Sequence, residues 1–280
     1  MTHPSENQAQ IDFWNGPGAD RWVREQERLD RLLRPFAELG LEKAAPRPGE
    51  RAVDVGCGCG ATTLLLSEAV GKAGSVLGVD ISERMLARAR ERTTHMPWAR
   101  FELGDAAEMR FSGDADLMFS RFGSMFFANP EKAFTNLRTA LRSEGRFCLV
   151  CWRDPTDNPW FLVPLRAAET IVPPMEPTPP DAPGPFSFAN GERLRRVFTG
   201  AGFSDVVLER RDLLVPLSTT GIDEAVDVAC LAGPVARMLL EADAATIARV
   251  RATIREALAP YARADRVEMM SSVWLATARA

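Results

Sequence analysis

Short apolar runs alternate with amphipathic segments between residues 51 and 152, and this alternation limits the fold more than any other feature of the chain. The apolar runs have the length of strands, and the segments between them place apolar residues at helical spacing. The expected strands are 51–55, 75–79, 99–103, 115–120 and 146–152, and the expected helices are 62–70, 82–92 and 130–141. Strands that alternate with helices in this way predict an α/β fold, with a mostly parallel sheet covered by helices on both faces.

The composition is that of an ordinary globular protein. The 280 residues are 46% hydrophobic and 26% charged, with a net charge of −4, so the chain is able to bury a sizeable core. It has no apolar run near the roughly 20 residues of a membrane span and no signal-peptide layout at its start. Five cysteines, an odd number, favour free thiols, so we expect a cytoplasmic protein. The acidic balance argues against a nucleic-acid partner.

Further elements are expected on both sides of this core. Helical periodicity over residues 8–39 is broken by the turn Asn15-Gly16-Pro17-Gly18, which predicts two helices. Seven of the 20 prolines fall between residues 173 and 185, and their apolar neighbours favour an ordered lid. Later expectations are a helix at 190–199, a strand at 205–209, two or three helices within 222–258 and a strand at 268–278. We therefore expect a helical cap at 1–45 and one domain at 46–280, with lid elements at about 155–190 and 216–264.

A glycine-rich loop follows the first expected strand and precedes the first expected helix of the core. Its sequence is Asp54-Val55-Gly56-Cys57-Gly58-Cys59-Gly60. The glycine spacing is G-x-G-x-G, whereas the dinucleotide fingerprint is G-x-G-x-x-G, so a nicotinamide-dependent oxidoreductase is disfavoured. The acid two positions before the first glycine suits a ligand that presents an ammonium group and carries no phosphate.

Three further segments lie at the ends of expected strands: Gly78-Val79-Asp80-Ile81-Ser82, Gly104-Asp105-Ala106 and Ser120-Arg121-Phe122-Gly123. With these segments and the glycine loop, the chain resembles the class I S-adenosylmethionine-dependent methyltransferases of the small-molecule type over roughly residues 51–152. In that family the glycine loop lies against the methionine part of the cofactor, and the acid of the loop reaches the amino group through hydrogen bonds. The acid that ends the second strand accepts both ribose hydroxyls, and neighbouring apolar side chains sandwich the adenine. The ends of the third and fourth strands contact the adenine amine and line the cofactor near its sulfonium. The resemblance assigns cofactor binding to Asp54, Gly56, Cys57, Gly58, Gly60, Asp80, Ile81, Met85, Gly104, Asp105, Ala106, Ser120, Arg121 and Phe122.

The resemblance also implies a fold and an activity. The fold is a doubly wound sheet of seven strands, mostly parallel with an antiparallel last strand, with N-terminal helices and a helical, proline-rich lid insertion. The activity is methyl transfer from S-adenosylmethionine to a small, largely apolar acceptor, by an in-line displacement that depends on alignment and desolvation. A non-catalytic protein that binds S-adenosylmethionine or a partner through the same core is the alternative. We expect a monomer or a homodimer.

Apolar aromatic residues are plentiful, whereas residues that titrate near neutrality are scarce. The chain has 15 Phe and 6 Trp against two His and one Tyr, which makes a hydrolytic triad improbable. The expected acceptor-binding residues are Trp14, Trp22, Met125, Trp152, Trp160, Phe186 and Phe188, although core packing of about half the aromatic residues would leave the same pattern.

The remaining candidate residues are weaker. Arg121 would orient an anionic or oxygen-bearing substrate, or equally form an ion pair with a nearby acid. If the acceptor is a hydroxyl, the candidates for assisting proton loss are Arg121, Arg153, Asp157 and solvent. Cys148 and Cys151 lie three apart in one expected strand and so point to opposite faces, which favours packing over metal binding. No His, Asp and Glu cluster has the spacing of metal ligands, so no metal is expected.

Overall fold

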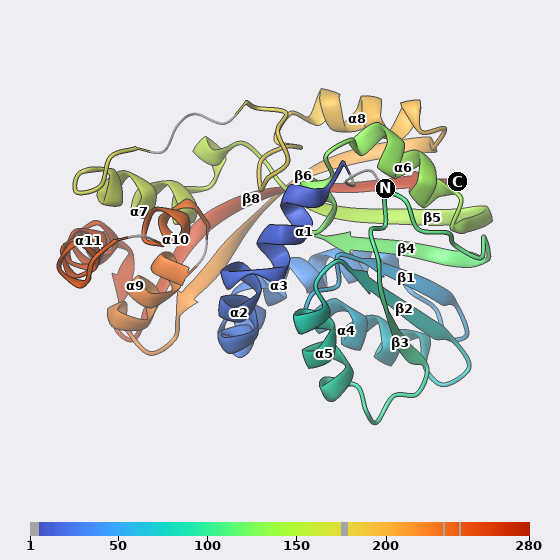
Figure 1. Ribbon diagram of the computed structural model, residues 1–280, viewed down its shortest axis with the longest axis horizontal. Helices are drawn as coiled ribbons and strands as arrows, with labels where there is room; N and C mark the ends of the chain where they lie inside the picture. Colours follow the sequence, from blue (N-terminus) through green and yellow to red (C-terminus); the bar gives the residue numbers. More distant parts are fainter. Residues whose placement is uncertain (1–5, 175–178, 232, 241) are drawn as a thin grey trace, which may run out of the picture.

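A computed structural model describes residues 6–174, 179–231, 233–240 and 242–280. One β-sheet forms its centre (Figure 1). Within these residues eight strands pair in the order β3-β2-β1-β4-β5-β8-β6, and the short β7 pairs with β8. The strands are β1 (Arg51–Val55), β2 (Ser75–Asp80), β3 (Ala99–Leu103), β4 (Ala115–Arg121), β5 (Leu141–Trp152), β6 (Ser204–Ser218), β7 (Ala262–Arg263) and β8 (Arg266–Arg279). The first five strands run parallel, and β8 lies antiparallel between β5 and β6. This confirms the predicted fold, with β7 as an additional strand of two residues.

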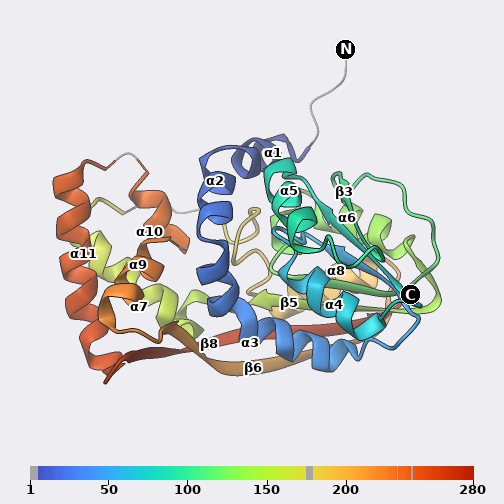
Figure 2. The same cartoon turned by 90° about the horizontal axis from the view of Figure 1, so that it is seen from below.

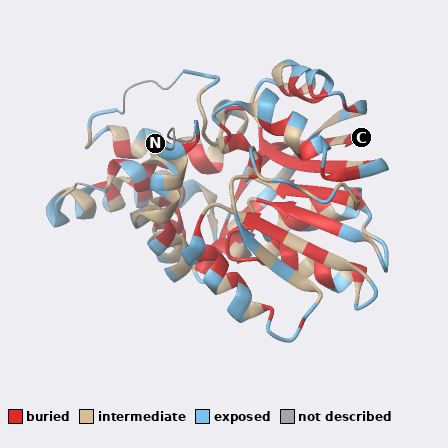
Figure 3. Cartoon of the chain, turned by 45° about the vertical axis from the view of Figure 1, so that its right-hand side comes forward, coloured by how far each residue is buried: buried red, intermediate tan, exposed pale blue. Residues whose placement is uncertain are grey.

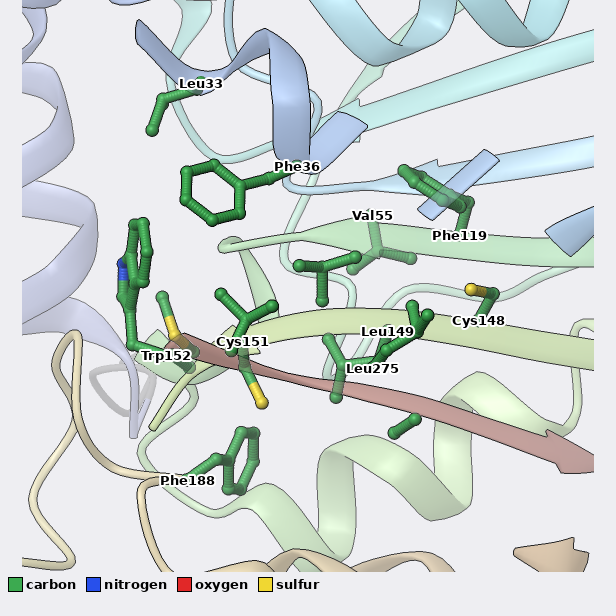
Figure 4. Close-up of a cluster of buried hydrophobic side chains, with 14 of the residues drawn as sticks. Leu33, Phe36, Val55, Phe119, Cys148, Leu149, Cys151, Trp152, Phe188 and Leu275 are labelled. Atoms are coloured by element: carbon green, nitrogen blue, oxygen red, sulfur yellow. The ribbon is translucent and has the colours of Figure 1, made fainter. Parts of the chain in front are cut away.

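Helices cover both faces of the sheet. The helices of the core are α3 (Gln26–Ala44), α4 (Ala61–Val70), α5 (Glu83–Arg92), α6 (Pro130–Arg138) and α8 (Gly191–Gly200). Figure 4 shows Phe36 of α3 and Phe188 on opposite sides of β5 and β8. Cys148 and Cys151 also point to opposite sides, and the Cys148 thiol donates to Gly40 O of α3. Buried residues are concentrated in the sheet and on the helix faces that pack against it (Figure 3).

The remaining helices form two groups at one end of the sheet. The first is α1 (Gln8–Asn15) and α2 (Pro17–Arg24), which precede α3. The second is a lobe of α7 (Pro159–Glu169), α9 (Ile222–Leu231), α10 (Gly233–Met238) and α11 (Ala244–Leu258), carried on the far ends of β6 and β8 (Figure 2). Single 3-10 turns occur at η1 (Ser124–Phe126), η2 (Pro155–Asp157) and η3 (Ala259–Tyr261). None of the described helices combines the length and apolar character needed to cross a membrane.

Several elements differ from the sequence predictions. The region before the core forms three helices rather than two, because the chain breaks again at Glu25. Helix α7 was not predicted, since Pro159 and Pro164 both count against a helix; Pro159 occupies its first turn, where no hydrogen bond is lost. Strand β6 is three times as long as the predicted strand because it pairs with β8 along nearly its whole length. Residues 1–5, 175–178, 232 and 241 of the predicted cap and lid elements lie outside the described residues.

Candidate active site

A cavity of about 1230 Å³ lies at the carboxyl ends of the parallel strands. The strand order reverses between β1 and β4, and such a switch point is where open α/β sheets bind ligands. The strands supply the floor of the cavity through the loops that follow β1, β2, β3 and β4. Helices α1, α2, α3, α7 and α10 and residues 179–190 supply the remaining walls. The site is therefore built from a rigid sheet edge and from helices distant in sequence.

The glycine loop is held tightly between its neighbouring strands. Gly56, Gly58 and Gly60 all have left-handed backbone conformations, with φ angles of 67°, 53° and 80°. The amides of Gly56 and Cys57 both donate to Val79 O at the end of β2, at 2.9 and 3.2 Å. A Cβ atom at Gly56 would lie 2.6 Å from the Cα atom of Gly123 in the loop after β4. Only glycine satisfies both the conformation and the close approach at this position.

Asp80 ends β2 and faces the cavity beside this loop. Its Oδ2 accepts a hydrogen bond from Gly58 N at 2.8 Å, and its Oδ1 accepts one from Ser82 N at 2.9 Å. Each oxygen keeps a lone pair, so the carboxylate is able to accept two more hydrogen bonds from a diol. Burial raises the pKa of Asp80 to about 6, and the two backbone donors oppose that shift. Ile81 and Met85 line the cavity next to it.

Asp105 presents a second acceptor to the cavity from the loop after β3. Its Oδ1 accepts a hydrogen bond from Ala107 N at 2.9 Å, while its Oδ2 is buried and has no partner among the described residues. Gly104 and Ala106 line the cavity on either side of it. A buried acceptor without a partner is costly, so a ligand that donates a hydrogen bond is the natural complement of this wall.

Three residues of the predicted cofactor set do not line the cavity: Asp54, Gly60 and Ser120. Asp54 is fully buried, its Oδ2 accepts hydrogen bonds from the Thr62 and Thr63 hydroxyls, and burial raises its pKa. Its Oδ1 has no partner within the described chain. Gly60 lies against Ala89. Ser120 donates to Val55 O and accepts from Ser124, which ties β4 to β1 and to η1.

Aromatic side chains enclose the other end of the cavity. Phe122 has a left-handed φ of 63°, uncommon outside glycine, and its ring stacks on Trp152 with centroids 3.9 Å apart and planes 8° apart. Phe36 packs edge-on against both rings, and Trp160 lies 5.3 Å from Trp152. A strained backbone that is fixed by packing is typical of functional sites. The parallel pair of rings makes this wall flat and apolar.

The other predicted acceptor-binding residues are divided between the cavity and the core. Trp14, Trp22, Met125 and Phe186 line the cavity, and Trp14 packs edge-on against both Trp22 and Phe126. Phe188 does not line it. That ring is buried against Phe134, at a centroid distance of 5.7 Å, on the opposite side of the sheet from α3.

Of the three weak catalytic candidates, one lines the cavity and two do not. Arg121 lines the cavity, and its Nη1 donates to Leu33 O of α3 at 3.2 Å. Arg153 and Asp157 do not line it: they form an ion pair at 2.8 Å, and the guanidinium of Arg153 lies 4.3 Å from the ring centroid of Trp274. Their immediate neighbours Asp154 and Pro155 do reach the wall.

Charged residues from helices also line the cavity, and the sequence carried no signal for them. Arg21 of α2 donates to Ala236 O, and Arg237 of α10 lies over the ring of Phe13. Asp30 of α3 pairs with Arg92 at 2.7 Å. These residues belong to no motif and follow no strand, so only the packing of distant helices brings them together.

Comparison with known proteins agrees with this geometry. A family profile described as a methyltransferase domain matches residues 52–145. The chain is 34% identical over 146 residues to a nocamycin O-methyltransferase from Saccharothrix syringae, covering 50% of this chain and 51% of that protein. It is 30% identical over 183 residues to demethylmenaquinone methyltransferase from Staphylococcus aureus, covering 62% of this chain and 73% of that enzyme. The chain belongs to the class I S-adenosylmethionine-dependent methyltransferases.

The matches cover different shares of the relatives' lengths. The chain spans 34% of the length of one curated relative, an uncharacterized protein of a Streptomyces fradiae transposon, and about half of the nocamycin enzyme. Its fold is similar to that of phosphoethanolamine N-methyltransferase 2 from Haemonchus contortus, solved with S-adenosyl-L-methionine. That similarity has a TM-score of 0.58 at 17% identity and covers 96% of this chain and 59% of the other.

The polar groups on the cavity wall fit the methyltransferase cofactor, S-adenosylmethionine. Asp80 has acceptor capacity for two ribose hydroxyls, and the unpartnered Oδ2 of Asp105 suits the adenine amine. A Cβ atom at Gly58 would lie 2.9 Å from the terminal methyl carbon of Met85, so the glycine leaves room where a ligand approaches. Among the described residues, no group of three or more His, Cys, Asp and Glu is arranged to hold a metal ion.

The raised pKa of Asp80 predicts pH-dependent cofactor affinity for this methyltransferase. A diol that donates two hydrogen bonds to this carboxylate binds best when the carboxylate is ionised, so affinity is expected to fall as pH decreases through the folded pKa of about 6. S-adenosylhomocysteine should bind about tenfold more weakly at pH 5 than at pH 7 when measured by calorimetry. Asp80→Asn, which cannot titrate, should show no such loss, and an equal loss in both proteins would contradict the assignment.

Proposed function

We propose that this chain transfers a methyl group from S-adenosylmethionine to a small, largely apolar acceptor. One observation carries the proposal: a single cavity joins the glycine loop, Asp80 and Asp105 at one end to the Phe122–Trp152 stack at the other. The names of two relatives, a nocamycin O-methyltransferase and a demethylmenaquinone methyltransferase, support a small-molecule acceptor.

The buried residues Asp54, Gly60 and Ser120 are proposed to fix the loop and strands behind the cavity wall. The proposed cofactor-binding residues are the predicted ones that line the cavity: Gly56, Cys57, Gly58, Asp80, Ile81, Met85, Gly104, Asp105, Ala106, Arg121 and Phe122. Bound S-adenosylmethionine supplies a methyl group that its sulfonium makes strongly electrophilic. The chain therefore has to hold the acceptor in line with that group and to exclude water, and the aromatic walls serve both needs. No general base is required of an acceptor that is already nucleophilic. We propose Trp14, Trp22, Met125, Trp152, Trp160 and Phe186 as acceptor-binding residues.

Turnover is tested with S-adenosylmethionine labelled in its methyl group. Incubation of the protein with the labelled cofactor and a small-molecule extract should move label into an apolar product, which chromatography separates from the cofactor. The Asp80→Ala variant is the control and should transfer none. Binding of the cofactor by calorimetry without label transfer from any extract would contradict the proposed activity.

We also propose a cellular location, a domain division and an oligomeric state for the enzyme. The net charge of −4 and the buried thiols Cys57, Cys59, Cys148 and Cys151 support a reducing, cytoplasmic setting without a nucleic-acid partner. We propose a helical cap at residues 1–45 and a methyltransferase domain at 46–280, with lid elements at about 155–190 and 216–264. A monomer or a homodimer is proposed, which sedimentation analysis distinguishes.

A further inference from the structure

Several buried polar atoms in and around the cavity have no hydrogen-bond partner. Among the described residues five side-chain atoms are of this kind. Three are Asp54 Oδ1 beneath the glycine loop, Asp105 Oδ2 on the cavity wall and Ser67 Oγ of α4. The other two, Arg121 Nε and Trp160 Nε1, are donors and belong to residues that line the cavity. These two donors call for a ligand group that accepts hydrogen bonds.

One nitrogen of the Arg121 guanidinium is hydrogen-bonded to the protein, and another is not. Its Nη1 donates to Leu33 O at 3.2 Å, which fixes the guanidinium against α3, while its buried Nε has no partner within the described chain. Asp30 on the cavity wall binds Arg92 at 2.7 Å and Gln26 at 2.5 Å, both through Oδ2, and no ion pair joins Arg121 to an acid within the described residues. Burial lowers the pKa of Arg121, whereas Asp30 and Asp54 raise it. Of the two interpretations that the sequence left open, the structure thus favours substrate contact over an ion pair.

Trp160 supplies the second donor from a different element. It lies on α7 with only 6% of its surface exposed, and its ring is 5.3 Å from Trp152. An indole N–H only donates, and a buried indole usually finds an acceptor. Here no acceptor is provided by the described residues, and Trp160, like Arg121, lines the cavity.

We infer that the acceptor molecule is a flat, apolar compound with an anionic oxygen group, a carboxylate or an enolate, which Arg121 and Trp160 bind by hydrogen bonds. This inference rests on the proposed function, and it moves Arg121 from the cofactor-binding residues to the acceptor-binding residues. A donor-only or cationic acceptor would leave both N–H groups unsatisfied, and would place a positive charge beside a guanidinium. The parallel stack of Phe122 and Trp152 favours a flat molecular body.

The test compares two probes on the protein saturated with S-adenosylhomocysteine. The probes are 2-naphthoate, which carries an anionic oxygen group, and 2-naphthalenemethanol, which is flat and neutral. Calorimetry should give at least tenfold tighter binding of the naphthoate by the wild-type protein. Arg121→Gln should weaken naphthoate binding by tenfold or more, because hydrogen bonds to charged groups are the stronger class, and should change binding of the alcohol by less than threefold.

Trp160→Phe is the second variant, because it keeps an aromatic ring and removes only the N–H. It should weaken naphthoate binding by threefold to tenfold, without lowering affinity for S-adenosylhomocysteine. Arg166→Gln is the matched control: it removes an equal charge from α7 at an exposed ion pair outside the cavity, and it should leave both probes unaffected.

The outcomes separate this inference from the proposed function. If the wild-type protein does not bind S-adenosylhomocysteine, the proposed function fails. If it binds that ligand but does not prefer naphthoate, the inference fails and the proposed function stands. Loss of S-adenosylhomocysteine affinity in Arg121→Gln, with unchanged preference for naphthoate, would assign the guanidinium to the carboxylate of the cofactor and would also overturn the inference.

Discussion

Replacing Gly56 by alanine should abolish cofactor binding and destabilise the fold. The new Cβ atom would lie 2.6 Å from the backbone Cα of Gly123, and the residue would keep a left-handed φ of 67°. The left-handed conformation costs about 1–2 kcal/mol for a residue with a side chain, and overpacking adds about 1–3 kcal/mol. We expect the free energy of unfolding to fall by about 2–5 kcal/mol in urea titration. We also expect no heat of S-adenosylhomocysteine binding in calorimetry.

Gly49→Ala provides the matched control for this substitution. Gly49 also has a positive φ, 86°, in a turn where Glu50 N donates to Arg47 O, but no atom lies within 4 Å of the position its Cβ would take. The control should therefore lose only about 1–2 kcal/mol of stability and should bind the cofactor as the wild type does. Equal effects of the two substitutions would show that conformation alone, rather than the approach of the β1 and β4 loops, determines the requirement for glycine.

Asp80→Ala should weaken binding of S-adenosylmethionine and S-adenosylhomocysteine by more than a hundredfold. The substitution removes the acceptors proposed for both ribose hydroxyls, and hydrogen bonds to a charged group contribute about 1.5–3 kcal/mol each. It also leaves the amides of Gly58 and Ser82 without their present acceptor, so the glycine loop loses one hydrogen bond to the end of β2 and keeps those to Val79 O. Calorimetry at pH 7 measures the affinity, and circular dichroism checks that the variant folds.

Asp116→Ala is the corresponding control at the opposite end of the sheet. Asp116 lies near the start of β4, where it accepts hydrogen bonds from Arg51 N and from the guanidinium of Arg142. Its removal should lower thermal stability and leave cofactor affinity within twofold of the wild type. Undiminished affinity in Asp80→Ala, or an equal loss in Asp116→Ala, would contradict the assignment of Asp80.

The parts of the site that could be predicted are those whose position in the chain fixes their position at the sheet edge. Asp80 ends β2 and Asp105 lies two residues beyond the end of β3, and parallel strands bring their carboxyl ends to one edge, so their positions in the chain were enough to place them on one wall. The glycines of the loop were recognisable for the same reason. Asp54 is the exception among the motif acids, because Thr62 and Thr63 cover one of its oxygens and hold the carboxylate behind the loop.

The parts that could not be predicted depend on contacts between distant segments. Four successive charged residues, Glu209 to Asp212, obscure the strand pattern of β6, which continues through them because β8 supplies a partner for each. Arg21 and Arg237 reach the cavity only because α2 and α10 meet above it. Phe188 could be assigned to the acceptor pocket from its neighbours in the sequence, but the face of the sheet on which it lies is set by tertiary packing.

The long pairing of β6 with β8 has a consequence for how acceptor preference can change in this fold. The segment that carries α9, α10 and α11 leaves the sheet at Ser218 and returns at Val267, and these two residues are register partners. Because its ends are adjacent, the segment can gain, lose or exchange helices without shifting the strands on which the cofactor end depends. The chain thus separates the sheet edge proposed to bind the methyl donor from a helical segment beside the proposed acceptor site, and grafting residues 219–261 between relatives is a direct way to redesign what is methylated.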